Sequence, residues 1–386
     1  SSGAQAIGGN LTKPETMEQM WKIIQVQQQQ INQMTTKLDS VSKTAKNNEV
    51  AVLDRKTSVL AEEVEKIRTE MFIPEDIEYK SAYGLGPAAS KVYQVGKGLS
   101  VGGYGEFNYQ SFVNDEKDNE QDNADFERLV LYVGYKFTDN ILFNSEIEFE
   151  HASTSKGVGS VSVEFAALDF LLDPMLNIRA GMLLVPMGFV NLIHEPPFYF
   201  GNNRPEVERA IIPSTWREIG AGVFGEVVPD LNYTMYAVNG LNAEGFSSSG
   251  VRGGRQKGSK ALAENFAIVG RLDYAPSAVP GLAFGVSSYL GDSGQGQVDA
   301  KVFTQIYEAH AEWKYRGLEM RALGSWGHIS DAALLSSLKG ETIGSSNYGV
   351  YAEIAYDVMP HILTNTSQYF APFFRYEKLD TIATAP

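Results

Sequence analysis

The sequence of 386 residues contains no cysteine, which excludes a disulfide framework, a thiol nucleophile and a cysteine metal site. Long apolar runs are missing as well, because no stretch approaches the roughly 20 uninterrupted apolar residues that a membrane-spanning helix needs. Positive charge is scarce: 32 Lys and Arg stand against 47 Asp and Glu, for a formal net charge of -15. This balance argues against nucleic acid as a partner, since phosphate backbones require a basic face.

Patterns typical of catalytic and metal sites are also missing. The five histidines are scattered without HExxH or paired spacing, at His151, His194, His310, His328 and His361. The glycine-rich run 102–105 lacks the strand-to-helix context of a phosphate-binding loop. Carboxylates are so frequent that their presence singles out no acid–base pair. We therefore expect no enzyme activity, no cofactor and no bound metal.

Aromatic residues and glycine are abundant, with 20 Phe, 19 Tyr and 37 Gly, which favours a tightly turned β protein. In the segment 307–315 the odd positions are Tyr, Ala, Ala, Trp and Tyr, and the even positions are Glu, His, Glu and Lys. A strand would place these two sets on opposite faces. An apolar face that is aromatic at its ends is typical of a strand that crosses lipid between two aromatic girdles. A half-buried strand of a soluble sandwich shows the same alternation, so repetition along the chain decides.

The alternation recurs throughout the rest of the chain. We place thirteen strands at about 98–110, 126–137, 141–151, 160–171, 176–186, 216–227, 230–240, 265–275, 281–290, 302–315, 317–328, 347–358 and 368–378. Short turns alternate with longer polar connections at 111–125, 152–159, 187–215, 241–264, 291–301 and 329–346. Short turns at one end and long loops at the other are typical of an outer-membrane barrel. The sequence therefore predicts an all-β fold over 96–386, an antiparallel transmembrane β-barrel. Because such barrels have an even number of strands, we expect 16, with C-terminal strands missing from this chain; the alternative is that the barrel closes by another device.

The first 73 residues follow a different pattern. Between 17 and 45, residues recur at spacings of three and four: Met17, Met20, Ile24, Gln27, Ile31, Met34, Leu38, Val41 and Ala45. So narrow a seam needs a partner helix, and it predicts an α-helical coiled-coil oligomerisation arm over 1–73, in a dimer or a trimer. The polar core position, Gln27, fits a role in register or oligomer state. Residues 74–95 are interpreted as a linker. The small, polar start of the chain is interpreted as a mature N-terminus after signal removal.

Several stretches carry a resemblance to a known family: 103–107, 128–137, 146–151, 179–182, 186–188 and 213–218. On these stretches the chain resembles outer-membrane porins of the phosphate-selective porin O/P superfamily, of the DcaP-like type with an N-terminal coiled coil. The resemblance implies passive diffusion of small polar or anionic solutes through a water-filled trimeric channel. It also implies the outer membrane of a Gram-negative bacterium, contact with its lipid and lipopolysaccharide, and an N-terminal arm in the periplasm. An alternative is a structural anchor or surface receptor whose coiled coil tethers the barrel to a periplasmic partner.

The connection 187–215 is unusual for an exposed loop because Phe198, Tyr199 and Phe200 follow one another. These rings would be buried if the loop folded back into the barrel. We therefore expect a pore constriction in which two arginines face two glutamates, formed by Tyr199, Arg204, Glu206, Glu208 and Arg209.

Alternation places further charged residues on the polar faces of the strands. The expected pore-lining residues are Arg128, Arg179, Arg217, Arg271, Arg321, Arg375, Glu106, Glu146, Glu148 and Glu308. Guanidinium groups along a pore would suit phosphate, sulfate or carboxylate solutes, because each donates in bidentate fashion. Alternatively, each arginine pairs with an acidic residue on a neighbouring strand.

Overall fold

The computed structural model describes residues 17–42, 80–112, 121–152, 159–363 and 367–386. The chain divides into two compact units, Ser1–Glu78 and Tyr79–Pro386, and each is treated separately below. Within these described ranges, no helix combines the length and the apolar character needed to cross a membrane.

The first unit contains the helix α1, Met17–Ser42, of 26 residues. Its sequence is rich in Gln, Met and Lys and holds no Gly or Pro, a composition that favours the helix. Apolar side chains on α1 are nonetheless exposed, including Ile24, Ile31 and Met34 at 44%, 54% and 62%. The side chains of Met17, Met20, Leu38 and Val41, and the continuation of the predicted coiled coil beyond residue 42, lie outside the described part of the chain.

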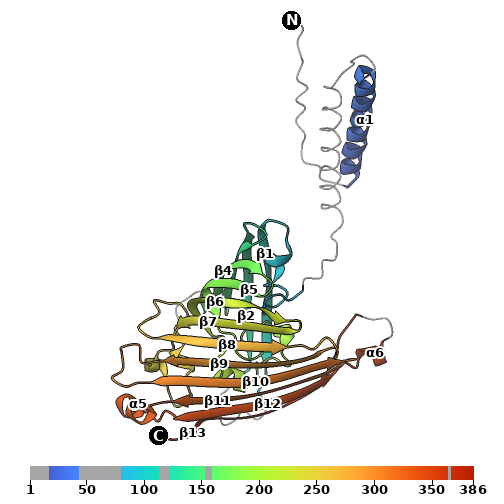
Figure 1. The fold of residues 1–386 in the computed structure, drawn as a ribbon. Helices are drawn as coiled ribbons and strands as arrows, with labels where there is room; N and C mark the ends of the chain where they lie inside the picture. Colours follow the sequence, from blue (N-terminus) through green and yellow to red (C-terminus); the bar gives the residue numbers. More distant parts are fainter. Residues whose placement is uncertain (1–16, 43–79, 113–120, 153–158, 364–366) are drawn as a thin grey trace. The chain divides into compact units, whose positions relative to one another are not determined.

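The second unit is built on one antiparallel sheet of 13 strands that follow one another in chain order (Figure 1). The strands are β1 Gly98–Gln110, β2 Asn123–Lys136, β3 Ile141–Glu150, β4 Ser160–Asp173, β5 Leu176–Leu184, β6 Arg217–Val228, β7 Leu231–Asn239, β8 Phe266–Tyr274, β9 Leu282–Asp292, β10 Phe303–Tyr315, β11 Leu318–Ile329, β12 Ser346–Tyr356 and β13 Phe373–Thr384. The predicted all-β class is confirmed. The first twelve strands lie within three residues of their predicted bounds.

The last strand was predicted at the wrong place, because β13 begins at Phe373 and ends at Thr384 rather than spanning 368–378. The run 369–374, with four aromatic residues, resembles a strand start, but Pro372 has no N–H to donate to a sheet ladder. Pairing starts after it, at Phe373 opposite Ala355, and continues to Thr384 opposite Ser346.

The two faces of the sheet differ in chemistry, as β10, β11 and β12 illustrate. Tyr307 and Trp326 lie on one face, 41% and 46% exposed, with their rings stacked 6.0 Å apart. Glu308, Arg321 and Glu353 lie on the other face and are 4%, 8% and 4% exposed. A sheet in a water-soluble protein buries its apolar face and exposes its polar one. This sheet does the reverse, and we call its sides the apolar face and the charged face.

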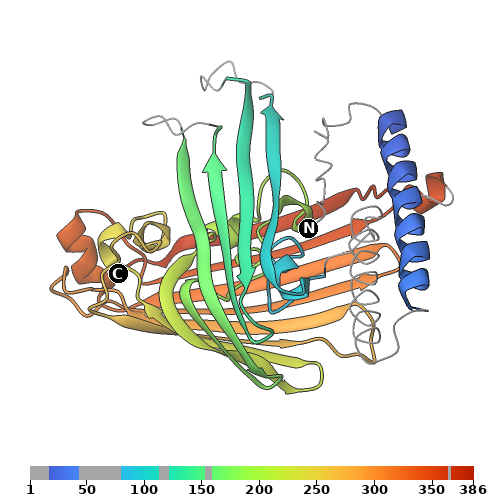
Figure 2. The ribbon, with the colours of Figure 1, turned by 90° about the horizontal axis from the view of Figure 1, so that it is seen from above.

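The sheet is strongly curved: β1 to β4 stand steeply against β8 to β13 (Figure 2). Backbone pairing runs in order from β1 to β13, and in the described ranges these two strands do not pair with each other. Short turns join alternate strands. One of them, Arg316–Gly317, has positive φ at both residues, the backbone that two-residue hairpins prefer. At another, Gly281 has a φ of +78° and a Cβ there would lie 1.8 Å from the Lys314 carbonyl oxygen.

Four of the long connections, at 187–215, 241–264, 291–301 and 329–346, pack together over the charged face. They contain η1 Pro196–Phe198, α4 Glu206–Ala210, η2 Ala243–Gly245, η3 Arg252–Gly254 and α5 Ala332–Lys339, and α6 Met359–Ile362 follows β12. Their apolar residues join those of the strands in one buried cluster, which includes Trp216 and Tyr289 with ring centroids 4.8 Å apart. The connection 329–346, expected to be polar, contributes the buried Leu335 of α5.

Residues 80–95, the described part of the predicted linker, also pack on the charged face. This segment ends in the short helix α3, Lys91–Gln94, and its Leu85 and Ala89 join a buried cluster with Tyr132 and Phe165. Asn144 donates from Nδ2 to the Ala89 carbonyl oxygen at 2.8 Å. These residues therefore belong to the second unit.

Candidate functional site

The connection between β5 and β6 lies across the charged face, held by strand arginines. Arg271 Nη1 donates to the Gly188 carbonyl at 2.6 Å, Arg321 Nη1 to Phe198 at 2.5 Å, and Arg375 Nη2 to Phe200 at 2.7 Å. Backbone carbonyls in a buried loop need such donors, because an unpaired one costs about 1–3 kcal/mol. Three of the predicted pore-lining arginines thus position the loop.

The same connection contacts the first strands of the sheet. His194 Nε2 lies 3.1 Å from a Glu146 carboxylate oxygen, and both side chains are buried. Burial lowers the pKa of His194, but the charge of Glu146, its hydrogen bond and the charge of Glu164 together outweigh burial and raise the pKa above its usual value. Tyr132 Oη also donates to Glu195 at 3.4 Å. The loop therefore bridges strands at both sides of the sheet.

The helix α4 places its charged residues in two different environments. Glu208 is fully buried, accepting hydrogen bonds from Tyr351 Oη at 2.6 Å and Val190 N at 2.7 Å. Burial raises the pKa of its carboxyl group to about 7. A Cβ on Gly188 would lie 2.5 Å from Glu208 Oε2, so this approach requires glycine. Arg209 is exposed and holds Glu206 through two 2.6 Å hydrogen bonds.

The residues predicted for a constriction lie in one loop but do not form two facing pairs. Arg209 pairs with Glu206 one turn away on the same helix. Glu208 is fully buried and therefore does not face this pair across a passage. Tyr199 is buried at 7% exposure. Arg204 has no carboxylate within ion-pair distance in the described part of the chain, and its Nη2 is buried without a hydrogen-bond partner there.

All six strand arginines are paired with acidic side chains. The pairs are Arg128 with Glu106, Glu127 and Glu148; Arg179 with Asp169; Arg217 with Glu164; Arg271 with Asp273; Arg321 with Glu312 and Glu353; and Arg375 with Glu353 and Glu377. Glu146 and Glu308 instead pair with His194 and His310. Several partners were missed because strand register is needed to find them, as with Glu353 directly opposite Arg321.

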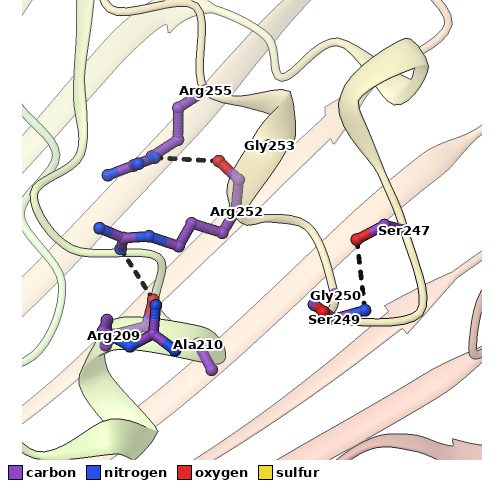
Figure 3. Close-up of a pocket in the computed structure, with 8 residues that line it drawn as sticks. All are labelled: Arg209, Ala210, Ser247, Ser249, Gly250, Arg252, Gly253 and Arg255. Atoms are coloured by element: carbon purple, nitrogen blue, oxygen red, sulfur yellow. Dashed lines mark hydrogen bonds between the residues drawn. The ribbon is translucent and has the colours of Figure 1, made fainter. Parts of the chain in front are cut away.

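Two further arginines were not singled out in the sequence. They belong to the connection between β7 and β8, at η3, where Arg252, Arg255 and α4 border a hollow of about 350 Å³ (Figure 3). Arg252 Nη1 donates to the carbonyls of Arg209 and Ser214, and Arg255 Nη1 to those of Thr215 and Pro213. Across the described ranges, neither guanidinium has a carboxylate within 4.0 Å.

Burial and neighbouring cations both act on these two groups. Burial, followed by the charges of Arg209 and Arg204, lowers the pKa of Arg252 to about 10. Burial, followed by Arg252, lowers the pKa of Arg255 to about 9. The signal in the sequence was the spacing of Arg252, Arg255 and Lys257 in a glycine-rich connection, which alone resembles a solvated turn.

No family model matches the sequence. Among solved structures, OmpF of Salmonella typhi in complex with daunomycin is 12% identical, with 74% of this chain and 79% of that chain covered and a TM-score of 0.47. The outer membrane channel DcaP of Acinetobacter baumannii is 13% identical, with 74% and 92% covered and a TM-score of 0.40. At these scores neither likeness supports a conclusion about function. An uncharacterized protein of Aquifex aeolicus (strain VF5) is 40% identical over 338 residues, which cover 83% of this chain and 74% of that protein. The chain therefore belongs to the same family as this Aquifex aeolicus protein.

Proposed function

We propose that this protein is an outer-membrane porin through which small polar solutes, preferentially anions, diffuse passively. The observation that carries the proposal is the reversed sheet, with apolar side chains exposed and charged ones turned inward. Each large apolar side chain removed from water contributes about 1.5–3 kcal/mol, so an outward apolar face is costly in water and favourable in lipid. Paired charges along the other face suit a polar channel interior.

The proposal includes closure of the curved sheet into a barrel, with 16 strands as expected from the sequence. A closed barrel leaves no unpaired backbone at its edges, which a lipid environment requires. We further propose that three copies associate, that outer-membrane lipid and lipopolysaccharide contact the apolar face, and that α1 lies in the periplasm of a Gram-negative bacterium. The anion preference is supported by Arg204, Arg252 and Arg255, which lack carboxylate partners in the described ranges.

Conductance across planar lipid bilayers tests the proposal directly. The full chain should produce ohmic current steps, grouped in threes if the channels are trimeric, and a reversal potential of anion-selective sign in a salt gradient. Replacing Arg204 with Ala should reduce the anion preference, whereas Arg209→Ala should change it less, because Glu206 already neutralises Arg209. Membranes that remain silent despite correctly inserted protein would contradict the porin function and favour the anchor or receptor.

A further inference from the structure

The arginines of the strands and those of the connection between β7 and β8 differ in whether a carboxylate lies beside them. Each of the six arginines on the strands has at least one carboxylate partner within 4.0 Å. Arg252 and Arg255 are partly buried yet have no such partner in the described ranges. A cation that is partly buried loses hydration free energy. Hydrogen bonds to carbonyl oxygens restore only a part of it, because these oxygens carry no net negative charge.

The carbonyl contacts fix the two guanidinium groups without using all their donors. Arg252 makes its hydrogen bonds through Nη1, to the carbonyls of Arg209 and Ser214, which leaves Nε and Nη2 without partners in the described chain. Arg255 uses Nε for the Arg252 carbonyl at 3.0 Å and Nη1 for Pro213 and Thr215, which leaves Nη2. Positioned donors of this kind are pre-organised for an oxyanion, because a guanidinium fork matches carboxylate and phosphate geometry.

Both groups border one hollow, seen in Figure 3 between η3 and α4. Its other wall carries Ser247 and Ser249, whose hydroxyl groups both donate and accept hydrogen bonds. The volume of about 350 Å³ is at the small end of pockets that bind organic ligands. The hollow therefore has room for an anionic group together with a short polar body.

We propose that this hollow is a binding site for a small oxyanion, a phosphoryl or carboxylate compound, whose charged group is held by Arg252 and Arg255. The proposal rests on the porin function, because the hollow is bordered by α4 of the loop that crosses the charged face. The bound anion would supply the counter-charge that the two arginines lack. A solute held there would be concentrated at the channel before it passes.

Calorimetric titration of the purified full chain in detergent, at low salt, tests the site with inorganic phosphate, succinate and chloride in separate arms. Phosphate or succinate should bind with chloride much weaker, and the better of the two identifies the phosphoryl or the carboxylate class. The double variant Arg252→Gln/Arg255→Gln should bind the oxyanion at least about tenfold more weakly than the parent, since hydrogen bonds to charged groups are lost. Lys260→Gln, which removes one exposed charge from the same connection, should bind like the parent.

Because Arg252 and Arg255 also hold backbone carbonyls, a second pair of variants leaves them in place. Ser249→Glu brings a carboxylate to the hollow and should abolish oxyanion binding, whereas Ser249→Gln, of nearly equal size, should retain it. Equal binding by Ser249→Glu and Ser249→Gln, or no binding of either oxyanion by the parent, would overturn the site. Conductance in bilayers is measured on the same samples: channels without oxyanion binding refute the site alone, and binding without channels refutes the porin function.

Discussion

Burial of the Glu208 carboxyl makes the packing of α4 depend on pH. Its pKa is raised from an ordinary value of 4.5 to about 7, so the folded state holds a proton that the unfolded state has already released. The resulting stability is fully present below the unfolded pKa and is lost as pH rises through about 7. We expect the free energy of unfolding to fall by roughly 1–3 kcal/mol between about pH 5 and about pH 8.

Thermal unfolding of Glu208→Gln and of the parent checks this expectation. The variant keeps a neutral side chain that accepts from Tyr351, so its stability should change much less over the same pH range. Glu206→Gln, on the exposed side of the same helix, should behave like the parent. Identical pH profiles for Glu208→Gln and the parent would assign the pH dependence to another group.

Arg321 should prove to be an anchor of the inward loop. It contacts Glu312 and Glu353, donates to the Phe198 carbonyl and lies over the Phe200 ring at 5.5 Å. In Arg321→Ala the loop would lose these contacts and buried carboxylates would lose a partner, at a cost of about 3–5 kcal/mol. We expect larger and noisier single-channel currents from this variant. Arg316→Gln, in the exposed turn directly before β11, should leave both current and stability unchanged.

The face of the sheet on which a residue lies was predictable from the alternation in the sequence. Its contacts with other strands and with loops were not, because they depend on the tertiary structure. Period two placed Glu308 and Arg321 on the same face, because neighbouring strands share one pleat. The pairing of Arg321 with Glu353 depends on strand register, and the donation from Arg271 to Gly188 crosses 83 residues of chain. Arg252 and Arg255 were missed because nothing in a glycine-rich loop indicates which face of the sheet it will cover.

Among the elements, α1 carries the predicted coiled-coil seam, which can be tested by disulfide cross-linking. Ile24, Ile31 and Met34 share one side of the helix by spacing and are exposed. Because the chain has no cysteine, a single introduced one reports contacts between copies cleanly. Ile31→Cys should form a disulfide-linked dimer on mild oxidation, whereas Gln29→Cys, on the opposite side of the heptad, should link far less. Equal linking of the two variants would contradict a coiled-coil seam.

The strands were predictable because their signal is local, whereas the connections were not. Alternation of apolar and polar residues located the first twelve strands, and the error at β13 arose from an aromatic run that Pro372 separates from the ladder. The sequence also indicated that the connections are long. It did not indicate that they pack together, because Leu335 and Trp216 come from connections more than a hundred residues apart and meet in one cluster.

At the level of the whole molecule, the reversed sheet requires lipid against its apolar face, which a soluble protein does not. Val286 on β9 and Val279 in the turn before it are 51% and 42% exposed. In water, the same substitution at either site should therefore have a similar effect on stability. Val286 lies between Leu272 and Ala309 on the apolar face, midway along its strand, where lipid would cover it. Arginine on the lipid face near the bilayer midplane costs about 2–4 kcal/mol, whereas surface substitutions elsewhere stay within about 0.5 kcal/mol.

Val286→Arg and Val279→Arg therefore form a matched pair that separates a membrane channel from a soluble sandwich. In lipid vesicles the first variant should unfold at lower denaturant concentration than the parent, by an amount equivalent to roughly 2–4 kcal/mol, and the second should follow the parent. The difference should arise from the surroundings and not from the sheet, because neither valine belongs to the buried clusters. If both variants matched the parent in lipid, the apolar face would not be a lipid-facing surface, and the porin function would lose the observation that carries it.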